Sequence, residues 1–355
     1  MELEGKPDFE QAMQRIEAWF NHEILDRPPV RFAQHNAEYA GSLSAAGRSW
    51  PGLKERWFDA EFQVDHFLES IRGRKFYGET FPIYWPNLGP SVYAAFHGAT
   101  LDYAEVTSWA RPCVVDWEDI ERLTFSYNNE YFKGIEDLTR VALEKAGGKF
   151  MVGYTDLHGS LDCVADWRGA HQLCLDLMDA PERVHEMLGI ANHSFVPVFN
   201  YYDSLLKTHD QLSVTWMAIP SRGKMHIPSC DFTSMISRKA FDEFYLPYLL
   251  QEVENMTHNI FHLDGKGMLR HLDCILSIPQ IQAIQWVQGV GDDLPIEQWL
   301  PVIRKIQAAG KGVVVDLQLK ELEAFIAAMK PDGLYLCIAA EEQNQPDILK
   351  RVEKW

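Results

Sequence analysis

Two potential metal ligands stand two residues apart in the segment Phe261-His262-Leu263-Asp264-Gly265. The apolar run before them, residues 259–261, predicts a buried strand, and residues i and i+2 of a strand point to the same face. We therefore expect the imidazole of His262 and the carboxylate of Asp264 to project into one small volume. A hydrogen-bonded pair that holds no metal is the alternative for the same two side chains.

Further carboxylates fall where predicted strands end. Glu79 lies in the strand predicted over residues 76–83, Asp156 and His158 lie just beyond another, and Asp231 lies in a long connection over residues 218–236. Carboxylates and histidines at such places are candidates for proton transfer, and long connections without regular structure are usually functional. We expect catalytic roles for Glu79, Asp156 and Asp231, although ion pairing, turn formation or backbone capping would also use these residue types.

Aromatic side chains are the second chemical signal. They fall at or just after predicted strand ends, where they would form flat apolar walls for an aromatic or quaternary-ammonium ligand: Tyr39, Tyr84, Trp85, Tyr154, Trp216 and Trp286. We add His35, which follows the first predicted strand, to the expected substrate-binding residues. Any one of these aromatic residues, taken alone, is more often part of the core.

The elements that must position these residues alternate between strand and helix patterns. Predicted strands cover residues 29–33, 76–83, 149–154, 212–217, 259–263, 281–287, 312–316 and 333–338. Predicted helices cover residues 8–22, 181–207, 237–258, 266–276, 295–309, 318–329 and 345–353. The pattern predicts an α/β fold, a (β/α)8 TIM barrel forming a single domain over residues 1–355, with a helical extension over residues 1–28.

A doubly wound sheet is the competing topology. We favour the barrel because polar residues follow many of the strands, whereas an open sheet would concentrate them at one switch point.

Composition and charge exclude several classes of partner. The chain has 33 Lys and Arg against 51 Asp and Glu, a net charge of -18, which disfavours nucleic acids and anionic membranes. Its start lacks the basic and apolar regions of a signal peptide, and no apolar run reaches bilayer length. Because the six cysteines show no CxxC spacing, we expect no disulfide framework and a cytoplasmic location.

A long motif then suggests a family. Cys230-Asp231-Phe232 and residues 236–248 resemble the pattern Asp, then Leu-Ser-Pro-x-x-Phe-x-Glu-Phe-x-x-Pro-Tyr, of the uroporphyrinogen decarboxylase superfamily. Shorter matches lie at residues 26–30, 76–79 and 153–156. The resemblance implies a (β/α)8 barrel, in agreement with the alternation of elements.

Departures from the family pattern disfavour tetrapyrrole decarboxylation. The decarboxylases carry an Arg-Gln-Ala-Gly-Arg-Tyr segment after the first strand, whereas residues 33–39 of this chain contain no arginine. The family's catalytic Asp is replaced by Glu79, and its late Gly-His-Gly by residues 336–338. Neutral side chains would be poor substitutes for arginines in holding the carboxylates of a porphyrinogen.

The methyltransferase branch of the superfamily fits better. Its zinc site resembles a His-x-Cys pair and a later Cys, which implies that His262, Asp264 and Cys337 hold one zinc ion here. The resemblance implies metal-dependent transfer of a methyl group from a small methylated substrate, first of all a methoxylated aromatic. Glu79 or Asp156 would protonate the leaving atom, and cobalamin on a separate corrinoid protein would accept the methyl group.

Two other functions remain open at this stage. One is a metal-independent decarboxylase or lyase that uses the carboxylates and histidines as acids and bases. The other is a non-catalytic barrel that only binds a ligand. The sequence leaves the oligomeric state open, a homodimer included.

Overall fold

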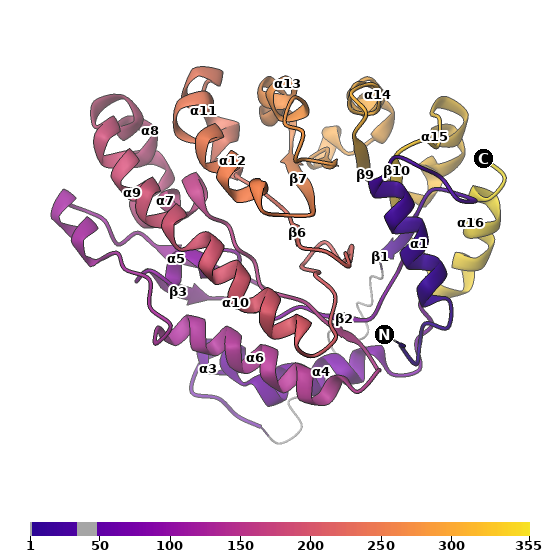
Figure 1. Cartoon of the computed structure of the whole chain (residues 1–355), viewed down its shortest axis with the longest axis horizontal. Coiled ribbons are helices and arrows are strands. Elements are labelled where there is room, and N and C mark those ends of the chain that lie inside the picture. Colours follow the sequence, from indigo (N-terminus) through magenta and orange to yellow (C-terminus); the bar gives the residue numbers. More distant parts are fainter. Residues whose placement is uncertain (1, 34–47) are drawn as a thin grey trace.

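The computed structural model describes residues 2–33 and 48–355. Its strands are β1 Val30–Ala33, β2 Ile83–Tyr84, β3 Thr100–Tyr103, β4 Ser108–Arg111, β5 Met151–Val152, β6 Met225–His226, β7 His258–Asp264, β8 Ala283–Val287, β9 Gly312–Gln318 and β10 Leu334–Ala339. Helices flank the strands and form an outer arc around them (Figure 1).

The α-helices are α1 Phe9–Phe20, α3 Leu53–Phe58, α4 Ala60–Ile71, α5 Val92–Ala95, α6 Glu130–Ala146, α7 Ser160–Arg168, α8 Ala170–Asp179, α9 Pro181–His193, α10 Phe195–Lys207, α11 Arg238–Phe244, α12 Leu246–Glu254, α13 Leu272–Leu276, α14 Leu300–Ala308, α15 Leu322–Ala328 and α16 Gln345–Val352. Short 3₁₀ helices are η1 Trp117–Arg122, η2 Asp231–Met235, η3 Lys266–His271, η4 Gly291–Asp293, η5 Ile296–Trp299, η6 Leu319–Glu321 and η7 Glu342–Asn344.

The central sheet is parallel and curled. Six strands pair in the order β1-β10-β9-β8-β7-β6, and β2 pairs in parallel with β5 in a separate sheet. At one seam between the sheets, the amide of Glu79 donates to the carbonyl oxygen of Val30 over 2.8 Å. At the other, the amide of Tyr154 donates to the carbonyl oxygen of Val214 over 2.9 Å. The architecture is consistent with a TIM-like barrel, but strand pairing does not close the ring in the described part of the chain.

Most predicted elements are confirmed, but the strand over residues 212–217 is wrong, and of the strand over residues 76–83 only the last residue lies in a strand, β2. The strand predicted over residues 212–217 is instead a turn, held by an isolated antiparallel bridge between Ser213 and Ser221. The strand at this position is β6, and β6 pairs with β7. Other features were not predicted: helices α3 to α8, the antiparallel β3–β4 hairpin, and the break between α9 and α10 at Ser194.

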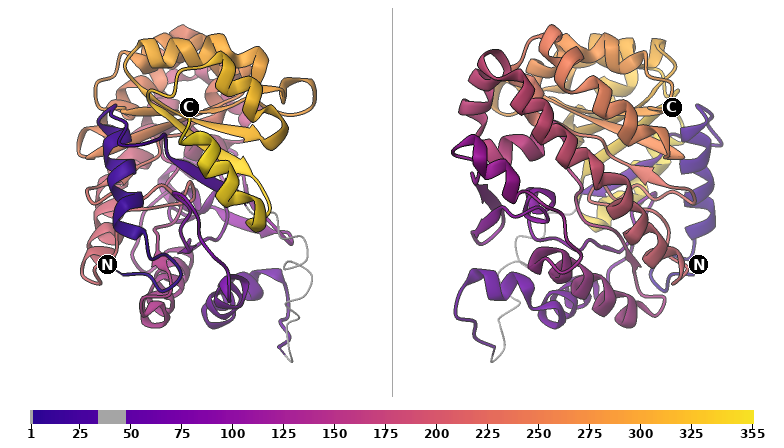
Figure 2. Two further views of the ribbon diagram at one scale, coloured as in Figure 1. Left: turned by 90° about the vertical axis from the view of Figure 1, so that its right-hand side faces the viewer. Right: turned by 60° about the vertical axis from the view of Figure 1, so that its left-hand side comes forward.

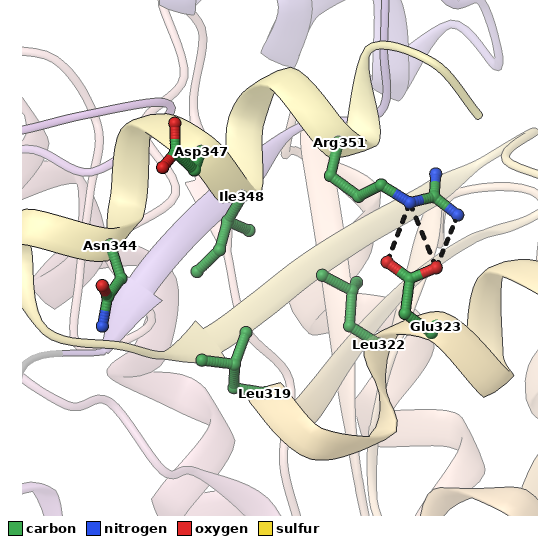
Figure 3. A pocket seen from close by; sticks show the side chains of 7 residues that line it. All are labelled: Leu319, Leu322, Glu323, Asn344, Asp347, Ile348 and Arg351. Carbon is green, nitrogen blue, oxygen red and sulfur yellow. Dashed lines mark hydrogen bonds and ion pairs between the residues drawn. The ribbon is translucent and has the colours of Figure 1, made fainter.

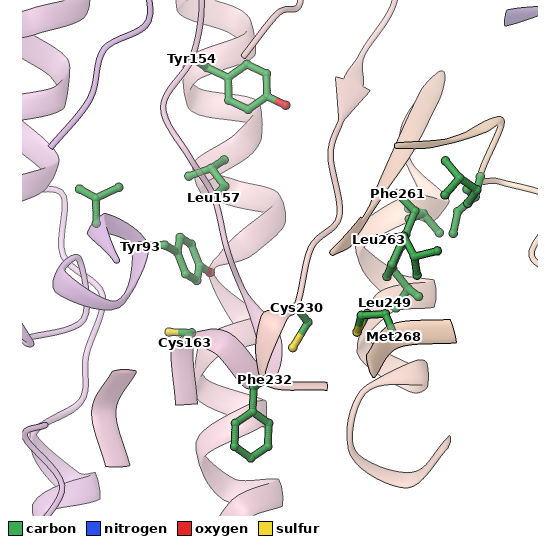
Figure 4. Packing of buried hydrophobic residues seen from close by; sticks show 14 of the residues in the cluster. Tyr93, Tyr154, Leu157, Cys163, Cys230, Phe232, Leu249, Phe261, Leu263 and Met268 are labelled. Carbon is green, nitrogen blue, oxygen red and sulfur yellow. The ribbon is translucent and has the colours of Figure 1, made fainter. Parts of the chain in front are cut away.

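Strand alternation divides the buried apolar residues into two clusters. The outer cluster lies between the strands and the helices, and Figure 4 shows two of its members on β7, Phe261 and Leu263, beside Leu249 and Met268. The inner cluster combines the apolar face of α1 with inward-facing strand residues such as Ile260, Val314 and Tyr335. The next residue inward along β7 after Ile260 is His262, so strand geometry directs His262 to the interior.

Helix α1 covers the amino ends of the strands. The indole of Trp19 donates to the carbonyl oxygen of Gly333 over 2.8 Å, and the ring packs so closely on Gly312 that a Cβ there would lie 2.9 Å from it. Phe20 stacks on His258 at the start of β7. The predicted helix over residues 8–22 is thus confirmed, and Figure 2 shows α1 in indigo running along one side of the strands.

A buried histidine makes the fold sensitive to acid. The ring of His97 is fully buried and bonds the carbonyl oxygen of Tyr93 and the hydroxyl of Ser194. Burial lowers the pKa of His97 to about 4. Because an unfolded histidine has its pKa near 6.5, protonation of the unfolded chain draws the equilibrium toward unfolding below that pH.

We therefore predict that stability contributed by neutral His97 is complete above pH 6.5 and is lost as the pH falls toward 4. Between pH 6.5 and 5 the wild type should lose roughly 2 kcal/mol more free energy of unfolding than a His97→Gln variant. Denaturant unfolding of both proteins across this range measures the difference. Parallel pH profiles of the two proteins would contradict the assignment.

Candidate functional site

Three potential ligands converge where β7 ends. The side chains of Asp231, His262 and Asp264 each offer one ligand atom, and these atoms all lie within 4.8 Å of one another. His262 and Asp264 come from β7, and Asp231 begins the 3₁₀ helix η2. We call this group the acidic cluster. The predicted convergence of His262 and Asp264 is confirmed as geometry.

The ring of His262 is oriented by its neighbours. Its Nδ1 lies 2.6 Å from Oε1 of Gln285 on β8, and the ring meets the edge of Trp216 at a centroid separation of 5.2 Å. Since an amide oxygen only accepts, Nδ1 carries the proton and Nε2 keeps a free lone pair. In metal sites, a hydrogen bond from the ring nitrogen that does not bind the metal fixes the tautomer and the orientation of the histidine.

Asp231 is held in place by a buried carboxylate on α7. Asp162 accepts the backbone amides of Asp231 and Phe232, both over 3.0 Å, and the thiol of Cys230 lies 3.3 Å from it. Burial, with a smaller contribution from the charge of Asp231, raises the pKa of Asp162 to about 7. The start of η2 is therefore tied to α7, and its position depends on Asp162.

The charges of the acidic cluster suit a divalent cation. Burial raises the pKa of Asp231, the positive charge of His262 opposes this, and the negative charge of Asp264 adds to it. Two carboxylates this close repel each other, and a bound cation would remove that cost. One imidazole and two carboxylates form a harder donor set than the thiolate-containing set expected from sequence, and this set accepts zinc as well as other first-row metals.

Cys337 does not join the acidic cluster, which corrects the expected metal set. Its side chain points inward from β10, where its Sγ lies 3.3 Å from Nη2 of Arg31. Burial raises the pKa of this thiol to about 11, so it stays protonated at neutral pH. Asp231, which comes from a different segment, takes the third place.

Glu79 is also separated from the cluster, which corrects its expected catalytic role. Its fully buried carboxylate bonds Arg27 at 2.7 and 3.1 Å, Arg15 at 3.2 Å, and the amide of Val30 at 2.6 Å. Val30 begins β1, so Glu79 lies toward the amino end of the barrel, whereas Asp264 lies at the carboxyl end of β7. Glu79 joins helix α1 to the first strand.

Asp156 is buried and His158 is half-buried on the segment that follows β5. Burial raises the pKa of Asp156 well above its usual range. Burial and the charges of His262 and His226 lower the pKa of His158 to about 4, so its ring is neutral. Within residues 2–33 and 48–355, Oδ1 of Asp156 and Nε2 of His158 have no hydrogen-bond partner.

The predicted aromatic wall is mostly in the outer core instead. Trp216 contacts His262, but Tyr84, Tyr154 and Trp286 belong to the outer cluster, where they pack on rings such as Phe150, Phe199 and Trp299. The reason is alternation along the strands: Gln285 points to His262, so its neighbour Trp286 points to the helices. Trp85 is half-buried. His35 and Tyr39 lie outside the described residues.

Sequence reasoning missed three residues of this region. Arg31, Asp162 and Asp316 were not singled out as site residues. Arg31 and Asp316 carried a readable signal, because a charged residue inside an apolar strand such as Gly312–Gln318 is rare unless it has a function. Asp162 acts through a contact between distant segments, which no local pattern reveals.

One surface pocket lies away from the acidic cluster. It has a volume of about 320 Å³ and lies between η6, α15 and α16 (Figure 3). Its charged residues are paired, Glu323 with Arg351 at 2.8 Å and Asp347 with Lys350 at 3.1 Å. We therefore leave this pocket out of the candidate site.

Comparison with known proteins gives a match to a solved structure. No protein family model matches the chain. No curated protein matches it either. Among solved structures, it is similar to a methyltransferase from Methanosarcina mazei, with a TM-score of 0.65 and 11% sequence identity over 97% of this chain and 98% of that chain. At this identity the similarity shows a shared fold over nearly the whole length.

Across residues 2–33 and 48–355, every helix is either too short or too polar to cross a bilayer.

The new position of Glu79 is testable. Glu79→Gln should lower the free energy of unfolding by about 3–5 kcal/mol, because it leaves two buried arginines incompletely compensated. The affinity for a divalent metal should stay unchanged, since Glu79 lies outside the acidic cluster. Denaturant unfolding and calorimetry measure the two quantities. If the variant is as stable as the wild type but has lost its metal affinity, Glu79 belongs to the metal site and the prediction is wrong.

The acidic cluster should bind a divalent cation. Zinc or manganese titrated into metal-free protein should bind with one-to-one stoichiometry, and Asp231→Asn or Asp264→Asn should weaken binding by roughly 10- to 100-fold. Asp347→Asn, an exposed carboxylate on α16, is the matched control and should leave the affinity unchanged. Equal affinities of all four proteins in calorimetry would rule out the site.

Proposed function

We propose that this protein transfers a methyl group from a small methylated donor to cobalamin carried by a separate corrinoid protein. The observation that carries the proposal is the acidic cluster beside Trp216 at the carboxyl end of β7. Two further points support it: the motif resemblance to the uroporphyrinogen decarboxylase superfamily, and the fold shared with a methyltransferase.

The proposed reaction balances with one proton. The bond between the donor's oxygen and its methyl carbon breaks, and its electron pair stays on the oxygen. The methyl carbon is taken up by cob(I)alamin, whose cobalt supplies both electrons of the new bond. The released oxygen then takes a proton to give an alcohol or phenol.

Residues of the chain have separate parts in this reaction. Asp231, His262 and Asp264 would hold a divalent cation, zinc first, which when bound supplies Lewis-acid polarisation of the donor's heteroatom. Trp216 offers an aromatic face next to His262 and favours a flat donor such as a methoxylated aromatic. Asp156 is the proposed proton donor, because burial raises its pKa and because it lies two residues before His158, whose pKa is lowered in part by the charge of His262.

One observation favours a second function. Oδ1 of Asp156, whose pKa is raised by burial, and Nε2 of the neutral His158 are buried without hydrogen-bond partners in the described part of the chain, as a general acid and base would be. A metal-independent decarboxylase or lyase would use these groups and leave the acidic cluster without a catalytic task. Its activity would survive treatment with a chelator.

The test is methylation of cobalamin under anaerobic conditions. Purified protein, loaded with zinc or manganese, is mixed with cob(I)alamin and a panel of methoxylated aromatics, and conversion to methylcobalamin is followed by visible absorption. We expect transfer from at least one donor, and a loss on the order of 100-fold for His262→Ala. Arg222→Gln, which alters an exposed ion pair with Glu10 and Glu17, is the control.

Two results would contradict the proposal. One is transfer that persists unchanged in His262→Ala and in chelator-treated protein. The other is metal-loaded protein that methylates no cobalamin with any donor of the panel.

A further inference from the structure

Arg31 is a half-buried cation with no carboxylate at ion-pair distance among the described residues. The other enclosed arginines are each paired with a carboxylate: Arg15 with Asp26 and Glu79, Arg27 with Glu79, and Arg168 with Asp176. Within the residues that the structure describes, no carboxylate lies within 4 Å of Arg31. In a chain of net charge -18, this exception calls for an explanation.

The guanidinium of Arg31 is only partly satisfied by the protein. Arg31 lies opposite Cys337 in the β1–β10 ladder and, like Cys337, points to the interior. Nη1 donates to the carbonyl oxygen of Met217, and Nη2 lies 3.3 Å from Sγ of Cys337. Nε is buried and has no partner in the described chain. A carbonyl oxygen and a neutral sulfur are weak acceptors for a full positive charge.

A strained turn links Arg31 to the acidic cluster. Residues 213–221 form this turn, in which Trp216 contacts the ring of His262 and the next residue, Met217, accepts from Arg31. Ala218 has a φ of 55°, a left-handed conformation that costs free energy in a residue other than glycine. Arg31 and Ala218 both line a pocket of about 270 Å³.

The two charged regions face each other across the interior. In the sheet order, β7 and β1 are four strands apart, so the curvature of the sheet turns the inward side chains of His262 and Arg31 toward one another. Asp316 on β9 responds to both, because the charges of Arg31 and His262 each oppose the rise that burial causes in its pKa. Asp316 lies beyond ion-pair distance from Arg31, so its charge favours the guanidinium only through a longer-range interaction.

We propose that Arg31 binds a carboxylate of the substrate, so that the donor is a carboxylated methoxyarene whose anionic group lies at β1 while its methoxy group lies at the acidic cluster. The planar guanidinium matches a carboxylate, and a bound anion would supply the ion-pair partner that Arg31 lacks among residues 2–33 and 48–355. This inference rests on the proposed function, and it names the substrate class of the same site.

Binding of matched ligands tests the proposal without any turnover. Calorimetry with zinc-loaded and metal-free protein compares 4-methoxybenzoate with its neutral analogue 4-methoxybenzamide. We expect the carboxylate to bind tighter by on the order of 10-fold or more, and to keep this preference without metal. Equal affinities for the two ligands, or no measurable binding of the carboxylate, would overturn the proposal.

Variants assign the preference to Arg31. Arg31→Gln should remove the preference and leave the affinity for the amide unchanged, and Arg31→Lys should restore part of it. Arg222→Gln is the matched control and should bind both ligands like the wild type. If Arg31→Gln weakens both ligands equally, Arg31 only supports the turn and the proposal is wrong. Should Arg31→Gln fail to fold, the wild-type comparison and Arg31→Lys still decide.

The outcome is separable from that of the proposed function. Carboxylate-selective binding without cobalamin methylation would refute methyl transfer and retain the anion site. Methylation from neutral donors only, with no carboxylate preference, would refute the anion site and retain methyl transfer.

Discussion

The alternation of side chains along parallel strands decides which residues of this site face the interior and which face the helices. On β7 it sends Phe261 and Leu263 to the helices and leaves His262 and Asp264 for the interior. On β8 it gives Gln285 to His262 and Trp286 to the outer core. A shift of one residue in either strand would exchange these sets and bury the imidazole among apolar side chains.

The same rule explains which sequence predictions succeeded. His262 and Asp264 are two residues apart on one strand, so a local pattern was enough to bring them together. Tyr84, Tyr154 and Trp286 were assigned to the mouth because they fall near strand ends, but their parity along each strand places them outside. The strand over residues 212–217 was wrong because its apolar pattern also suits a turn that packs Trp216 and Met217 inside.

Contacts between distant segments were beyond sequence reasoning. Asp231 takes the place expected for Cys337 because Asp162, on α7, holds the start of η2. Glu79 lies within a predicted strand, but its partners Arg15 and Arg27 come from the first 27 residues and fix it at the amino end. Neither arrangement follows from spacing or composition, since each depends on which surfaces the folded chain brings into contact.

Helix α1 makes the two ends of the strands different from each other. Because its aromatic face occupies the amino ends of the strands, a small molecule and a macromolecular partner would have to share the opposite opening. In the proposed reaction the donor would then bind first, and the corrinoid protein would cover the opening when it docks. The shared opening would thereby impose an order of binding. The docked partner would also shield the methyl group from water during the transfer.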